Sequence, residues 1–290
     1  MLDTPEGWSD RPMTGTPAFG HKIDVRDEFT QSRARLLRLL DSLTSDDWER
    51  PTAAGAWTVR DLAAHLLGDD LSRLSRSRDA HVGEGPRPGE SLPEFIHRIN
   101  EEWVHATARI SPAVVVAMLE TTTPEVLEFW AASDLDEYGE PVTWAGPDPA
   151  PVWLDCARDF TEYWVHQEQI RDATGKHGSD VPEEVHAVLD TFLRAVPYTL
   201  EGRSWASGAG LAVQVEGPGG GRWSWRYNGD VWRAAVNEPD RETVVRFNDA
   251  DGLWRLCTRM LSPVEASRRA EVTGDGELAH RVLQIVSIIR

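Results

Sequence analysis

The segment WLDCARDFTEYWVHQEQIRDAT, residues 153–174, decides the fold of the first half of the chain. Its apolar residues recur at helical spacing, and Gly175 follows as a residue that commonly ends a helix. Glu162 and His166 are four residues apart, so they lie on one face of this predicted helix. Apolar neighbours such as Phe160 indicate a buried surface, where a carboxylate needs a partner.

A second predicted helix supplies that partner. Thr58 is a good N-cap, and Asp61 stands three residues later, where a capping box carries an acid. His65 follows among alanines and leucines, on a helix that should face the last one. Two histidines and one carboxylate from facing helices are typical of a catalytic metal site with an open position. Asp61 is expected either to cap the helix or to orient the His65 ring, and the residues leave both roles open.

A rival set of ligands lies on a third predicted helix, residues 91–110. His97, Glu101 and His105 follow one another at intervals of four residues. Charged neighbours indicate that this face is solvated. One straight helix also places the first and last of the three about 12 Å apart, too far to share a metal. We therefore interpret them as surface residues.

The remaining pattern of the first half is helical. Apolar residues at helical spacing predict a long helix over residues 22–43 and a mixed helical stretch over 112–129. A segment rich in Pro and Gly, residues 139–151, connects to the last helix. Four principal helices joined by a long crossover predict a four-helix bundle with non-adjacent connections, in which facing side chains make metal sites.

After residue 178 the pattern changes to an α+β arrangement. We expect a helix over 182–200, then strands with alternating polarity and a hairpin at the glycine-rich turn 217–221. The strands are predicted at 211–216, 223–227, 231–236 and 243–247, and two closing helices at 250–261 and 277–289. The sequence thus predicts a tail (1–20), a helical bundle (21–178) and an α+β domain (179–290).

Composition limits the class of protein. The 290 residues carry a formal net charge of −18, which disfavours binding to nucleic acid. The 2 cysteines form no disulfide framework, and Cys156 is expected to be a core thiol. No secretory signal is readable, and the longest apolar run, 113–119, is too short to cross a bilayer. We expect a cytoplasmic protein, a monomer or a homodimer, with no membrane partner.

Two stretches resemble a known family. Leu43-Thr-Ser-Asp-Asp-Trp-Glu-Arg-Pro-Thr is followed by Gly55-Ala-Trp-Thr-Val-Arg-Asp-Leu-Ala-Ala-His-Leu, and Phe160-Thr-Glu-Tyr-Trp-Val-His ends in Ala173-Thr-Gly. They resemble the mycothiol-dependent maleylpyruvate isomerase family, whose N-terminal domain is a DinB-like metal-binding four-helix bundle. The resemblance covers roughly residues 25–175. It extends more weakly over 180–290, as a sterol-carrier-like domain.

The resemblance implies that His65, Glu162 and His166 bind a divalent metal, usually Zn²⁺, with mycothiol as cosubstrate in an actinobacterial enzyme. Two departures concern the surroundings of that site. Residues 54–57, Ala-Gly-Ala-Trp, stand where the family often has Cys-x-Gly-Trp, and Gln169 stands where it often has Asp. The motifs are therefore more specific for fold and metal than for substrate.

The expected function follows from metal and thiol together. A bound dication lowers the pKa of a thiol, and the thiolate then attacks a small electrophilic substrate in S-transfer, thiol exchange or isomerisation. Arg222 and Arg226, on one face of a predicted strand, are candidates to bind a substrate carboxylate, although a solvated face explains them too. The alternatives are a hydrolase that uses metal-bound water and a non-catalytic metal-binding stress protein of the same fold.

Overall fold

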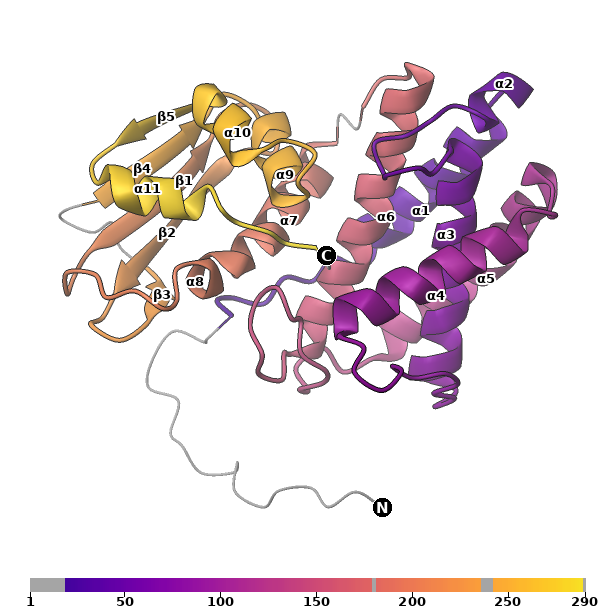
Figure 1. Ribbon diagram of the computed structural model, residues 1–290, viewed down its shortest axis with the longest axis horizontal. Coiled ribbons are helices and arrows are strands. Elements are labelled where there is room, and N and C mark those ends of the chain that lie inside the picture. Colours follow the sequence, from indigo (N-terminus) through magenta and orange to yellow (C-terminus); the bar gives the residue numbers. More distant parts are fainter. Residues whose placement is uncertain (1–18, 179–180, 236–241, 289–290) are drawn as a thin grey trace.

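The computed structural model describes residues 19–178, 181–235 and 242–288. An N-terminal helical region is followed by a five-stranded sheet with its own helices (Figure 1). This confirms the predicted mixed architecture. Of the predicted tail, residues 1–18 lie outside the described part of the chain.

Four helices of the N-terminal region form a closed ring. They are α1 (Arg26–Asp41), α3 (Val59–Arg73), α5 (Pro112–Ala132) and α6 (Val152–Thr174). Contacts run from α1 to α5, from α5 to α3, from α3 to α6 and from α6 back to α1. The short α2 (Ser45–Trp48) precedes α3, and α4 (Leu92–Thr107) packs on α3 from outside the ring. The stretch that the sequence indicates only as mixed is therefore a full ring member, because Val115, Leu119, Val126 and Trp130 are all buried.

Local sequence fixes where α3 begins and how close its neighbour lies. The predicted capping box is present, with the Thr58 side chain accepting from the Asp61 amide and the Asp61 carboxylate accepting from the Thr58 amide. One turn beyond His65, Gly68 has no side chain, and a Cβ there would lie 2.7 Å from the Trp103 indole. That gap lets Trp103 of α4 donate a 2.7 Å hydrogen bond to the Ala64 carbonyl. This hydrogen bond fixes the α3 backbone at the residue before His65.

The C-terminal region begins with α7 (Pro182–Phe192) and α8 (Val196–Thr199). Five strands follow in the spatial order β3-β2-β1-β4-β5: β1 (Gly210–Val215), β2 (Gly221–Tyr227), β3 (Trp232–Ala234), β4 (Glu242–Phe247) and β5 (Ala270–Thr273). The predicted hairpin is confirmed as antiparallel pairing of β1 with β2, while β1 and β4 pair in parallel. Three further helices complete the region: α9 (Ala250–Cys257), α10 (Pro263–Arg269) and α11 (Gly276–Val282).

Three expectations for this region need correction. Strand β5 was not predicted, because an edge strand exposed along most of its length lacks the alternation of a half-buried strand. Helix α10, of only 7 residues, was not predicted either. The last helix ends at Val282, short of the predicted end at residue 289; residues 283–288 run on without helical structure, with Ile285 and Ser287 buried.

The helical region and the sheet are joined along α6. Helix α7 contacts α6, α1 and α9, and it lies between the sheet and the ring (Figure 1). Trp164 of α6 packs edge-to-face on Trp254 of α9, with ring centroids 5.4 Å apart. Arg255 of α9 forms a two-pronged ion pair with Asp172 near the end of α6. One face of α6 therefore belongs to the ring and another to the contact with α9. Among the described helices, none is long and apolar enough to span a membrane.

Candidate metal centre

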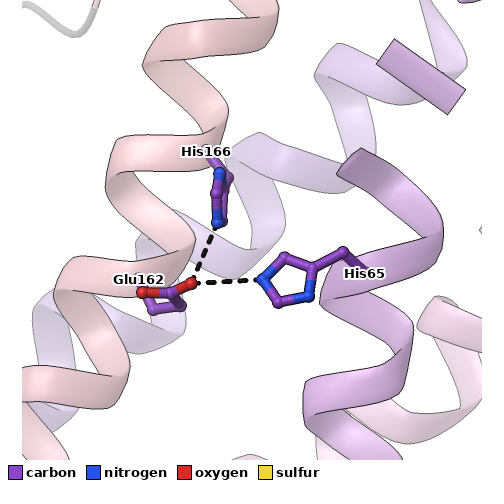
Figure 2. A group of neighbouring side chains, drawn as sticks. All are labelled: His65, Glu162 and His166. Carbon is purple, nitrogen blue, oxygen red and sulfur yellow. Dashed lines mark hydrogen bonds and ion pairs between the residues drawn. The ribbon is translucent and has the colours of Figure 1, made fainter. Parts of the chain in front are cut away.

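Three predicted residues converge between α3 and α6. Glu162 and His166 project from α6, and His65 projects toward them from α3 (Figure 2). One carboxylate oxygen, Glu162 Oε1, lies 3.2 Å from His65 Nε2 and 2.9 Å from His166 Nε2. Within residues 19–178, 181–235 and 242–288, this is the only group of three or more His, Cys, Asp or Glu residues whose potential ligand atoms all lie within 4.8 Å of one another.

The site is buried at the histidines and more open at the carboxylate. The side chains of His65 and His166 are 5% and 11% exposed, whereas that of Glu162 is 40% exposed. The indole of Trp57 covers one side of His65, with ring centroids 4.9 Å apart. The side of the site at Glu162 is therefore the one that a small molecule can approach.

Asp69 is a fourth group at this site, and it was not predicted from the sequence. It stands one turn after His65 on α3, and its Oδ2 lies 3.3 Å from His65 Nε2. This oxygen is buried and accepts no hydrogen bond from any described residue. The signal was present in the sequence, because the spacing His-x-x-x-Asp is that of Glu162 and His166. Asp61, for which the sequence left capping and orienting His65 both open, is engaged in the cap of α3.

The charges around the site explain its titration. Burial would lower the pKa of His65, but the carboxylates of Asp69 and Glu162 outweigh it and raise that pKa to about 9. Burial would raise the pKa of Glu162, but the two histidines hold it well below its usual range. Burial, and then the charge of Glu162, raises the pKa of Asp69 to about 6, against the effect of His65. In the described structure, the ion-pair partners of Asp69 and Glu162 are histidines.

These residues fit a divalent metal by donor type and spacing. Two imidazole nitrogens and one carboxylate oxygen are ligands that zinc and similar metals accept. With bonds of about 2.1 Å, tetrahedral ligand atoms lie about 3.4 Å apart and octahedral neighbours about 3.0 Å. The distances of 2.9 and 3.2 Å to Glu162 Oε1 agree with that spacing. A cation would also give the buried Asp69 oxygen a counter-charge.

The rival set on α4 is not brought together. His97, Glu101 and His105 are all exposed. Glu101 nevertheless has a contact relevant to the site, because its Oε1 accepts a 2.9 Å hydrogen bond from the indole of Trp57. It thereby holds the tryptophan that packs on His65.

Arg222 and Arg226 are exposed and are not brought together with His65, Glu162 and His166. On β2 the alternate residue Trp223 donates a 2.9 Å hydrogen bond to Asp190 of α7, so this face of the strand is turned toward α7. The two arginines point to the opposite, solvated face, where Arg222 is paired with Glu242. Cys156 is buried, and burial raises its thiol pKa, as expected for a core thiol.

The family match lies in the helical half of the chain. Residues 29–171 match the family described as mycothiol maleylpyruvate isomerase N-terminal domain. A crystal structure of a histidine-to-alanine variant of the mycothiol-dependent maleylpyruvate isomerase is similar at 14% identity and a TM-score of 0.51, over 86% of this chain and 91% of that one. A second crystal structure of that enzyme matches at 16% identity and a TM-score of 0.49, over 80% and 86%. No curated protein matches the chain.

Proposed function

Because residues 29–171 belong to the mycothiol maleylpyruvate isomerase N-terminal domain family, we propose that the protein is a metal-dependent enzyme that activates mycothiol or a similar small thiol. The reaction is S-transfer, thiol exchange or isomerisation of a small electrophilic substrate. The observation that carries this proposal is the convergence of His65, Glu162 and His166 around one carboxylate oxygen, with Glu162 partly open to solvent.

Each residue has a distinct role in this proposal. His65, Glu162 and His166 hold a divalent metal, with Zn²⁺ as the first candidate. When bound, the metal lowers the pKa of a thiol so that the thiolate dominates near neutral pH. Trp57 shields one side of His65 from water, and Glu101 fixes the Trp57 indole. Binding the metal requires His65 to give up the proton that Asp69 and Glu162 favour in the metal-free protein.

The electrophile would enter at the Glu162 side. The carboxylates of Asp69 and Glu162 disfavour binding of an anionic substrate unless the metal is bound, because like charges repel at short range. Arg222 and Arg226 face away from α7, so a substrate carboxylate would need another partner.

Calorimetry with mycothiol tests this proposal. Zn²⁺-loaded protein is expected to bind the thiol, whereas the metal-free protein and a Zn²⁺-treated Glu162→Gln variant are expected to show no heat of binding. A mycothiol analogue with serine in place of cysteine separates thiol recognition from recognition of the sugar. Equal binding of both compounds by the loaded protein would contradict the thiol role. Turnover of activated esters without any thiol would point to a hydrolase.

A further inference from the structure

One amide side chain connects the candidate metal centre to the C-terminal region. Gln169 stands three residues after His166 on α6 and is 6% exposed. Its Oε1 lies 2.7 Å from His166 Nδ1. A carbonyl oxygen can only accept, so Nδ1 of His166 carries the hydrogen in this contact. That arrangement directs the other ring nitrogen, Nε2, toward Glu162 and the site.

The other end of the same amide contacts the C-terminal region. Gln169 Nε2 donates to the thioether sulfur of Met260, at 3.5 Å. A thioether sulfur accepts and does not donate, so it selects the amide orientation that leaves Oε1 facing His166. With the amide reversed, an NH₂ group would face the Nδ1 hydrogen. Met260 thus acts on a candidate ligand through a single intervening side chain.

The chain around Met260 is held in a defined conformation. Residues 258–261 form a turn after α9, which we call the Met260 turn. Arg259 there has a φ of 61°, a left-handed conformation that non-glycine residues seldom adopt. Its guanidinium donates to the carbonyl of Gln284, and the Leu261 amide donates to the Arg255 carbonyl at 2.9 Å. Strained backbone of this kind persists where the surrounding structure fixes it.

Helix α9, which leads into the Met260 turn, is anchored to α6 on both sides of Gln169. Trp164, which precedes Gln169 on α6, packs on Trp254 of α9. Asp172, which follows Gln169, pairs with Arg255 of α9. Any shift of α9 relative to α6 would therefore move Met260 relative to Gln169.

We propose that Gln169 is a positioning residue for His166, and that the Met260 turn sets its orientation, so that docking of α9 and metal binding are coupled. This rests on the proposed metal site. Because coupling free energies are reciprocal, metal binding in turn stabilises the contact between α6 and α9. The C-terminal region is thereby part of the metal-binding unit without providing a ligand.

Three single variants and one double variant test the coupling through Zn²⁺ affinity, measured by competition with a chelator. Gln169→Leu leaves His166 Nδ1 without its acceptor and is expected to weaken affinity about tenfold to a hundredfold. Gln169→Glu keeps an oxygen acceptor and is the rescue control, with affinity at or above that of the wild type. Met260→Leu conserves volume and is expected to weaken affinity about fivefold. In the Gln169→Leu background, Met260→Leu should have no further effect.

Amide hydrogen exchange separates the coupling from a simple loss of Zn²⁺ affinity, because it is measured with the site saturated. Zn²⁺ should slow exchange in residues 250–262 of the wild type, and this protection should be lost in Gln169→Leu at saturating Zn²⁺. Strands β2 and β3 serve as the internal control. Wild-type Zn²⁺ affinity in Gln169→Leu, fully additive effects in the double variant, or unchanged exchange in 250–262 would overturn the coupling alone. A wild-type protein that binds no Zn²⁺ would overturn the proposed function together with it.

Discussion

Helices α3 and α6 contribute to two polar clusters, one buried and one partly open to solvent at Glu162, which pair their carboxylates with positive charge in different ways. The inner cluster takes one residue from each ring helix: Arg33 from α1, Asp70 from α3, Thr122 from α5 and Tyr163 from α6. Arg33 Nη2 lies 2.5 Å from Asp70 Oδ2, and Thr122 and Tyr163 also donate to that carboxylate. All four side chains are buried. The inner carboxylate thus has its counter-charge within the protein.

The outer cluster comprises His65, Asp69, Glu162 and His166. Two of its members are adjacent in sequence to members of the inner cluster. Asp69 precedes Asp70, and Glu162 precedes Tyr163, so neighbouring residues on each helix point into different clusters. The outer carboxylates are paired with histidines, whose positive charge depends on pH. A buried carboxylate needs a partner of opposite charge, and a histidine supplies one only while it is protonated. The contrast supports the proposed metal site: the inner cluster holds the helices together, and in the proposal a metal completes the outer one.

The largest effect on folding is expected from the inner cluster. Asp70→Ala leaves the Arg33 guanidinium buried without its carboxylate, which should lower the free energy of unfolding by about 3–5 kcal/mol. Urea denaturation of the metal-free protein measures this. Asp69→Ala, next in the sequence, is the matched control and should lose far less. Equal losses in the two variants would remove the distinction between the clusters.

Metal should stabilise the protein only through the outer cluster. At Zn²⁺ a hundredfold above its Kd, the free energy of unfolding should rise by about 2.7 kcal/mol. His65→Ala should abolish this gain, while a Tyr163→Phe variant, weakened in the inner cluster, should keep it. Thermal unfolding with and without Zn²⁺ gives the comparison. A Zn²⁺ gain that survives in His65→Ala would place the metal elsewhere.

Zn²⁺ affinity should depend on pH because metal and proton compete for His65. The folded-state pKa of about 9 lies above the ordinary value of 6.5. In the metal-free protein, the stabilisation from protonated His65 is therefore complete below pH 6.5 and is lost as the pH rises through 9. Over the same interval Zn²⁺ affinity should rise by up to about tenfold per pH unit for this proton. Chelator competition at several pH values would refute the account if affinity stayed constant.

The smallest expected effect comes from Asp69→Asn, which removes one negative charge beside His65 and keeps the shape. Less attraction for the cation should weaken Zn²⁺ binding, but the pKa of His65 also falls, so less proton competition offsets part of the loss. The net weakening should be about fivefold at pH 7.5 and larger at pH 9, where His65, with a pKa of about 9, is only about half protonated and proton competition is much weaker. An unchanged affinity at pH 9 would mean that Asp69 does not act on the metal.

The sequence predicted the helices because helical spacing is a local property. Helical periodicity, the capping box at Thr58 and Gly175 at the end of α6 are local signals. The resemblance to a family then chose His65, Glu162 and His166 over His97, Glu101 and His105. The structure brings the first set together and leaves the second exposed.

What the sequence did not predict depends on contacts between distant segments. Glu101 holds Trp57 across 44 positions, and Gln169 contacts Met260 across 91 positions. No spacing rule connects such pairs. The orientation of β2, which turns Arg222 away from the ring, follows from the packing of Trp223 on α7. The edge strand β5 is missed because it is exposed and so has no buried face to mark it.

Elemental analysis of the protein as isolated tests the central claim most directly. Wild type and a His105→Ala control, altered on the exposed face of α4, are expected to carry about one equivalent of a divalent metal per chain. His166→Ala should carry almost none while keeping its helical circular dichroism. Metal retained by folded His166→Ala, or lost equally in His105→Ala, would contradict a metal centre built from His65, Glu162 and His166.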